Sequence, residues 1–223
     1  RFMNFIKLNS VYLLLIVFFL FPLYERNIKS PTQTYSHNKE KIMQDILSNL
    51  YADSIMQTLN LEQKIAQLII LDVYPKKNEY YYKSIDKWVN EKQIGGILLF
   101  RGEPTEMTKI INRFNSKSEI PLWVAIDGEW GVSMRVDSIR NLPKAMTLGA
   151  ITDNELIKQY GYHVGLQCKR MGFNMNMAPD ADVNCEPSNP VINYRSFGED
   201  RENVATKAIA YYMGMNEADI IAV

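Results

Sequence analysis

Strand-like apolar runs alternate with helical patterns along most of the chain, and this alternation restricts the fold more than any other feature. Runs of strand length and strand composition occur at 68–73, 94–100, 121–126, 173–178 and 219–223, with helical patterns between them. No hairpin signal joins any two of them. Repeated strand–helix units of this kind predict a parallel sheet with right-handed crossovers. The fold class is therefore α/β, either a closed (β/α)8 barrel or an open doubly wound sheet.

One further observation favours the barrel, and the length of the chain indicates that only part of a barrel is present. No GxGxxG follows the first strand-like run, which disfavours a dinucleotide-binding sheet. A complete barrel typically needs about 250 residues, and fewer are left here once 1–41 are set aside. We therefore expect the N-terminal part of a TIM barrel that reaches about its fifth strand.

Helix signals separate these runs. Asn60 is expected to cap a helix with Gln63 in a capping box and with Ile65 and Leu68 on its inner face. The pattern at 80–92 predicts a helix with Trp88 in the core. A helix at 104–115 starts with Pro104 and is expected to bury Met107, Ile110, Ile111 and Phe114. Another helix is expected to cover 202–216.

A further helix signal begins at 152–155, which matches a capping box opened by Thr152, and it closes at Gly172. Cys168 lies on its apolar stripe and is interpreted as a core residue, with His163 beside the stripe. The segment 179–200 has little periodicity, and loops of this length in compact domains usually carry function.

Composition excludes several classes. The 25 basic residues balance the 25 acidic ones, so no nucleic-acid partner is expected. Cys168 and Cys185 form no CxxC spacing, and His37 and His163 are isolated. We therefore expect no disulfide framework, no metal site and no cofactor.

The N-terminal region differs from the rest. Lys7 precedes the apolar run 11–23, which predicts a signal peptide or an N-terminal membrane anchor over residues 1–30. No A-x-A-like cleavage site follows, so cleavage stays open. Residues 31–41 are polar and are predicted to be a mobile linker, and 42–223 form the predicted α/β domain. An exported protein is expected: periplasmic, outer-surface or membrane-anchored.

The strongest candidate site is the stretch Ile120–Arg135, in which an apolar strand breaks into Asp127-Gly128-Glu129-Trp130-Gly131. Carboxylates, an indole and glycines directly after a buried strand suit the mouth of a pocket. In parallel α/β folds ligands bind at the carboxyl ends of strands. A strand-to-loop exit with solvated charges is the alternative.

Six segments together resemble the N-terminal barrel domain of glycoside hydrolase family 3: LEQKIAQL (61–68), IGGILLF (94–100), AIDGEWGVSMR (125–135), LPKAMTLGA (142–150), MGFNMNMAPDADVN (171–184) and NPVINYRSFGED (189–200). NPVI followed by RSFGED is the most specific of them. The EWG variant is most similar to β-N-acetylhexosaminidases of the Bacteroidetes type.

The resemblance implies a retaining exo-glycosidase for terminal β-linked N-acetylglucosamine, with a glycan or a peptidoglycan fragment as substrate. Asp127 would accept hydrogen bonds from sugar hydroxyls and Arg195 would donate to the same sugar. A loop staple between Arg195 and Glu199 or Asp200 is the alternative role. The nucleophile and the acid/base are expected beyond Val223, so no catalytic residue is assigned here and the chain alone is expected to be inactive.

The remaining residues of these motifs are assigned to the pocket rim or to loop orientation. Glu129 and Arg135 are expected to orient the loop, and Trp130 to plug the barrel mouth rather than stack on sugar. Asp182 and Asn184 are expected to bond backbone amides of the long loop. Asp180 departs from the family pattern, which commonly has an apolar residue there. A β-glucosidase of the same family and a non-catalytic carbohydrate- or peptidoglycan-binding protein remain alternatives.

Overall fold

The computed structural model describes residues 31–186 and 188–223, so the predicted leader at 1–30 lies outside the described residues. The chain divides into two compact units, 1–55 and 56–223. Helix α2 (Pro31–Thr58) begins in the first unit and ends in the second. Within the described ranges, no helix is both long enough and apolar enough to cross a bilayer.

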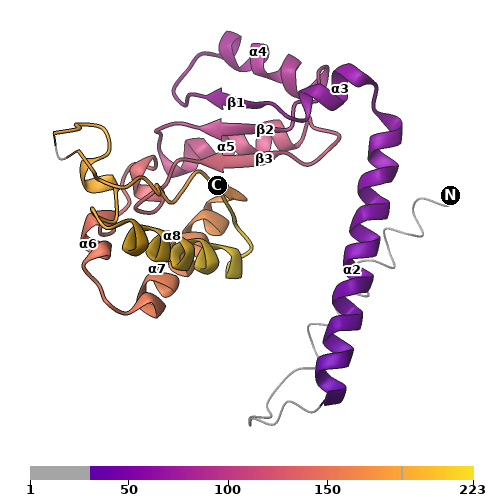
Figure 1. Cartoon of the computed structure of the whole chain (residues 1–223). Coiled ribbons are helices and arrows are strands. Elements are labelled where there is room, and N and C mark those ends of the chain that lie inside the picture. Colours follow the sequence, from indigo (N-terminus) through magenta and orange to yellow (C-terminus); the bar gives the residue numbers. More distant parts are fainter. Residues whose placement is uncertain (1–30, 187) are drawn as a thin grey trace. The chain divides into compact units, whose positions relative to one another are not determined.

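Residues 31–41, which were predicted to be a mobile linker, are helical and belong to α2 (Figure 1). Pro31 stands in the first turn, where a proline is tolerated, and neither glycine nor proline interrupts 32–58. Their role as a linker remains a prediction.

The second unit contains a five-stranded parallel sheet in the order β1-β2-β3-β4-β5 (Figure 1). The strands are β1 (Ile70–Val73), β2 (Gly96–Leu99), β3 (Trp123–Ile126), β4 (Met175–Asn176) and β5 (Ile221–Ala222). Each strand pairs with the next one in the chain, so the order never reverses. An open doubly wound sheet reverses its order at a switch point, whereas a barrel does not. The sheet is therefore a partial barrel, and the predicted α/β class is confirmed.

Helices connect the strands. They are α3 (Leu61–Ala66), α4 (Glu79–Asn90), α5 (Pro104–Asn115), α6 (Ala145–Gly149), α7 (Asn154–Met171) and α8 (Arg201–Glu217), with 3-10 turns η1 (Val132–Met134) and η2 (Asn193–Arg195). The bounds of α5 and the capping box of Asn60 with Gln63 agree with the prediction. Gly172 ends α7 in a left-handed conformation, also as predicted.

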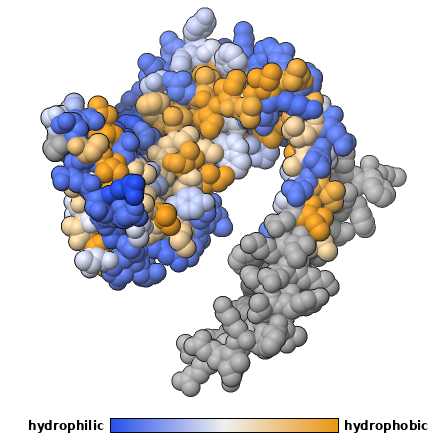
Figure 2. Space-filling view, in the orientation of Figure 1, coloured by the Kyte–Doolittle hydropathy of each residue, from blue (hydrophilic) through white to orange (hydrophobic). Residues whose placement is uncertain are grey.

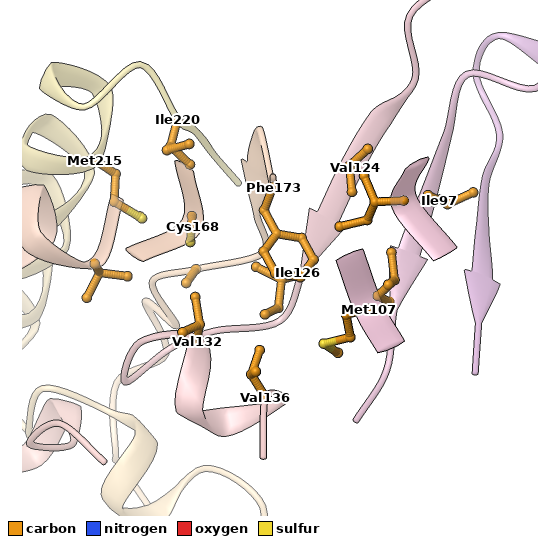
Figure 3. Close-up of a cluster of buried hydrophobic side chains, with 14 of the residues drawn as sticks. Ile97, Met107, Val124, Ile126, Val132, Val136, Cys168, Phe173, Met215 and Ile220 are labelled. Carbon is orange, nitrogen blue, oxygen red and sulfur yellow. The ribbon is translucent and has the colours of Figure 1, made fainter. Parts of the chain in front are cut away.

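The core lies between the sheet and these helices (Figure 3). Strand register explains which residues reach it. Ile97 of β2 pairs with Val124 of β3, and Leu99 pairs with Ile126 two residues further along. Residues two apart on a strand lie on the same face, so all four side chains point to the helix side. The helices supply Met107, Phe114, Cys168 and Met215, all of which are fully buried. Burial also raises the pKa of the Cys168 thiol to about 12, as expected for a core cysteine.

The opposite face of the sheet is more open. Trp123 and Ile221 occupy the alternate rows and are 43% and 38% exposed, and Leu98 is half-buried. Apolar surface accordingly gathers over the region of β1 to β3 (Figure 2). In a closed barrel, side chains from alternate strands fill this interior in layers, and five strands provide only part of them.

Three details of the predicted helices were wrong. Trp88 is 45% exposed, because the buried stripe of α4 passes through Ile85 and Val89 instead. Ile65 and Leu68 are exposed: the buried residue of α3 is Ala66 rather than Ile65, and Leu68 lies beyond the end of the helix. The cap of α7 is Asp153 rather than Thr152, because the Asp153 carboxylate accepts the Glu155 N–H at 2.9 Å.

Helices α7 and α8 pack closely through Gly161 and Gly214. A Cβ at Gly214 would lie 1.9 Å from the Lys158 carbonyl oxygen and 2.6 Å from the Tyr162 nitrogen, both of which are backbone atoms of α7. Since neither atom can rotate away, a side chain here would separate the helices.

Gly214→Ala is therefore expected to destabilise the protein by about 1–3 kcal/mol, the usual cost of overpacking a core. Helix propensity alone predicts the opposite, a gain of about 1 kcal/mol. The thermal unfolding midpoint of the complete protein distinguishes the two. An unchanged or higher midpoint would contradict the close packing of α7 and α8.

Candidate functional site

The predicted site residues gather where β3 ends. Asp127 directly follows the last residue of β3, and Glu129 lies two residues later. Arg195 lies 66 residues further on in η2, within the long segment 179–200, and the fold brings its guanidinium to Glu129. The carboxyl end of a parallel strand is therefore the place where these charges meet.

Arg195 and Glu129 form a multiply hydrogen-bonded ion pair. Arg195 Nε donates to both Glu129 carboxylate oxygens at 3.0 and 3.1 Å, and Nη2 donates to Oε1 at 2.8 Å. The Glu129 side chain is 5% exposed and that of Arg195 is 31% exposed. The alternative staple between Arg195 and Glu199 or Asp200 is not formed: the carboxylates that pair with Arg195 are those of Glu129 and Asp180, and Asp200 caps α8 through the Asn203 N–H.

Asp180 is the residue that sequence reasoning missed. Its side chain is 6% exposed and its Oδ2 lies 3.2 Å from Arg195 Nη2, although the geometry is that of an ion pair and not of a hydrogen bond. Its Oδ1 accepts the Asp182 N–H at 2.9 Å. The departure from the family pattern at this position is the signal that could have found it.

Burial and neighbouring carboxylates dominate the electrostatics of Glu129. Burial raises the pKa of the Glu129 carboxyl, and the charges of Asp180 and Asp127 add to the rise, while Arg195 opposes it. The Arg195 pKa is raised, chiefly by its hydrogen bonds to Glu129. Removal of the guanidinium would thus leave two buried carboxylates facing each other.

Asp127 has a different partner. Arg135 Nη2 donates to Asp127 Oδ2, and the Arg135 guanidinium lies over the Phe100 ring, 5.5 Å from its centroid. The Asp127 side chain is 30% exposed. Arg135 therefore holds one carboxylate oxygen of Asp127, and the role of Arg135 in orienting a pocket stays a prediction.

The loop that carries these residues is fixed from three elements. Asn176 of β4 bonds both sides of Gly128, accepting its N–H at 2.9 Å and donating to its carbonyl at 3.1 Å. Tyr211 of α8 donates its hydroxyl to the Glu129 carbonyl at 3.0 Å. Gln167 of α7 accepts the Val132 N–H at 3.3 Å. The loop is thus pre-ordered by residues that no local sequence signal pointed to.

The expected roles of Asp182 and Asn184 are not seen. Backbone amides of the long segment are bonded by other groups: the Asp180 side chain accepts from Asp182, and the Gly198 carbonyl accepts from Asn184 at 2.9 Å. Ser196 donates its hydroxyl to the Asp182 carbonyl at 2.5 Å. Asn184 is buried and its side-chain oxygen has no hydrogen-bond partner in the described structure.

The expected role of Trp130 as a plug of the barrel mouth stays a prediction. Trp130 is half-buried and makes an edge contact with Tyr194, with ring centroids 6.5 Å apart. No group of three or more His, Cys, Asp or Glu side chains is arranged to hold a metal within 31–186 and 188–223. The site therefore consists of three carboxylates and two guanidiniums at the end of a parallel sheet.

The partial barrel defines the class of the protein: it is a TIM-barrel-type α/β protein, and active sites in this class lie at the carboxyl ends of the strands. The family model described as "Glycosyl hydrolase family 3 N terminal domain" matches residues 60–223. The chain belongs to this family, and the resemblance noted in the sequence is confirmed.

Named relatives agree with the match. "Beta-hexosaminidase A" of Pseudoalteromonas piscicida is 29% identical over 151 residues, covering 62% of this chain and 25% of that protein. "Beta-hexosaminidase LpqI" of Mycobacterium tuberculosis is 28% identical over 174 residues, covering 74% of this chain and 42% of that one. The chain therefore spans about a quarter to two fifths of these relatives.

A solved structure gives the same result. The family 3 β-N-acetylglucosaminidase from Paenibacillus sp. is 31% identical, with a TM-score of 0.66, and the match covers 74% of this chain and 32% of that one.

Proposed function

We propose that the complete protein is a retaining exo-glycosidase that releases terminal β-linked N-acetylglucosamine from a glycan or peptidoglycan fragment. The observation that carries the proposal is the Asp127 carboxylate at the end of β3. Arg135 orients this carboxylate, which is exposed enough to accept hydrogen bonds from sugar hydroxyls. An ionised carboxylate can accept two hydroxyl donors at once, which is how terminal sugars are commonly held. The names of the relatives support the choice of sugar.

The proposal gives the described residues a binding role and no covalent one. A retaining glycosidase needs two carboxyl groups, a nucleophile and an acid/base, about 5–5.5 Å apart on either side of the scissile bond. Asp127 and Glu129 are each held by an arginine, and Glu129 is nearly inaccessible. We therefore place the nucleophile and the acid/base outside these residues.

The test is an assay of the complete protein on 4-nitrophenyl β-N-acetylglucosaminide and on the matching β-glucoside. We expect a higher kcat/KM for the acetamido sugar. Preference for the glucoside would favour the β-glucosidase alternative. The name of the relative from Cellulomonas fimi, "Beta-N-acetylglucosaminidase/beta-glucosidase", includes both activities. Binding of N-acetylglucosamine without turnover of either substrate would favour a non-catalytic sugar-binding protein.

We also propose that the protein is exported, on the basis of Lys7 followed by the apolar run 11–23. A relative named as periplasmic, the β-glucosidase/β-xylosidase of Dickeya chrysanthemi, supports this location. A reporter fused after residues 3–40 is expected in the periplasm or the membrane. A matched fusion in which Leu14 and Leu15 are replaced by Asp is expected to stay in the cytosol. Recovery of the unaltered fusion wholly in the cytosol would contradict export.

A further inference from the structure

Beside the proposed sugar site lies a cluster of one lysine and two aromatic rings. The Lys144 ammonium is 3.5 Å from the centroid of the Tyr194 ring and 4.8 Å from that of Trp130. Tyr194 is 47% exposed, and Trp130 and Lys144 are half-buried. Cation–π attraction to two rings holds the ammonium in one position.

The two aromatic residues of this cluster are neighbours in sequence of the residues that form the Glu129–Arg195 ion pair. Trp130 directly follows Glu129, and Tyr194 directly precedes Arg195, so the two rings flank the Glu129–Arg195 ion pair. Lys144 comes from a third segment, at the start of α6, where Tyr160 donates its hydroxyl to the carbonyl of the preceding Pro143 at 2.7 Å. Three separately anchored segments therefore meet beside the pocket.

The charge of Lys144 is what distinguishes this cluster from a packing contact. Among the described residues, no carboxylate forms an ion pair with it, whereas the nearby arginines 135 and 195 are both paired with carboxylates. Aromatic faces stabilise an ammonium but do not neutralise it. A positive charge held at a partly open surface, beside two aromatic side chains of which Tyr194 is 47% exposed, suits a ligand that has an apolar ring face and an anionic group.

We propose that Trp130, Tyr194 and Lys144 form a subsite for the leaving-group side of the substrate, and that Lys144 selects leaving groups that carry a carboxylate. The inference rests on the proposed glycosidase function and adds a specificity determinant to it. The rings contact the face of the leaving group, and the ammonium pairs with its carboxylate.

The test uses two aryl β-N-acetylglucosaminides that differ in one group, 3-carboxyphenyl and 3-carbamoylphenyl, with the complete protein. Lys144→Met is expected to lower kcat/KM for the carboxylate substrate about 2- to 5-fold, the factor expected for a partly exposed ion pair. The carboxamide substrate should change little. Lys144→Arg should retain most of the wild-type preference for the carboxylate substrate over the carboxamide substrate. Added salt should reduce this preference in the wild-type protein. Lys109→Met, at an exposed lysine of α5, is the matched control and should leave both substrates unaffected.

Equal effects of Lys144→Met on the two substrates, or no effect on either, would overturn the subsite. If Lys144→Met lowers the unfolding midpoint, the test uses Lys144→Arg and the salt dependence of the wild-type preference for the carboxylate substrate instead. A preference that salt does not change would also overturn the subsite. Hydrolysis of neither substrate by the wild-type protein would overturn the glycosidase function and this inference with it. Hydrolysis of both with no role for Lys144 would leave the glycosidase function standing.

Discussion

Arg195→Met is expected to lower the thermal unfolding midpoint of the complete protein by about 10 °C at pH 7. The substitution keeps the apolar stem but leaves Glu129 and Asp180, whose side chains are 5% and 6% exposed, without their shared cation. Breaking a buried ion pair by removing one partner typically costs about 3–5 kcal/mol, and each kcal/mol shifts the midpoint of a domain of this size by about 2–4 °C.

This loss should depend on pH in a defined direction. Burial already raises the pKa of Glu129, and without the guanidinium, which opposes this rise, the Glu129 pKa should rise further. A carboxyl group whose pKa is higher in the folded state than in the unfolded state destabilises the protein as pH rises above the unfolded value of about 4.3 and through the folded one. The variant should therefore approach wild-type stability near pH 4.

The matched double variant Arg195→Met with Glu129→Gln removes the cation and one carboxylate together. It should recover part of the stability at pH 7. An equal deficit at pH 4 and pH 7, or no recovery in the double variant, would mean that the ion pair is not what Arg195 contributes to stability.

Asp127→Asn is expected to lower kcat/KM of the complete protein for an aryl β-N-acetylglucosaminide by roughly 10- to 150-fold. The estimate corresponds to the loss of one hydrogen bond to a charged group, about 1.5–3 kcal/mol. The amide has nearly the same shape but loses the charge, and its NH₂ group can turn toward Arg135 or toward the sugar hydroxyls. Both effects weaken the contact with the transition state.

Asp153→Asn is the matched control, because Asp153 caps α7 and asparagine caps a helix equally well. It makes the same chemical change away from the site and should leave kcat/KM unaltered. Wild-type kinetics in Asp127→Asn, with the unfolding midpoint unchanged, would remove Asp127 from the sugar pocket.

Much of the fold was accessible from local patterns. Buried helix positions repeat every three or four residues, so the spacing of apolar residues alone identified the inward face of α5, which consists of Met107, Ile110, Ile111 and Phe114. The same reasoning failed for Trp88, since its hydrophobicity is local but its burial depends on which neighbour covers that side of α4. The capping error at Thr152 was of a single residue, because adjacent Thr and Asp can both cap a helix.

The candidate site divides in the same way. Asp127, Glu129 and Arg195 were found because they occur in motifs with a recognisable family order and because strand ends in parallel sheets carry ligand sites. Their pairing was not predictable. Glu129 and Arg195 are 66 residues apart, and the nearer candidates Glu199 and Asp200 have equal charge. Asp180 and Lys144 were missed as partners, because nothing local indicates that they reach Arg195 and Tyr194.

The sequence by itself therefore determined the α/β class, the approximate position of every strand, and the segment where the carboxylates lie. These follow from apolar periodicity and local backbone chemistry, which act over a few residues. Only the tertiary structure decided that the strand order is sequential, which separates a partial barrel from a doubly wound sheet. It alone also decided which arginine holds which carboxylate, because long-range pairing depends on how crossovers bring distant segments together and on which charges are buried there.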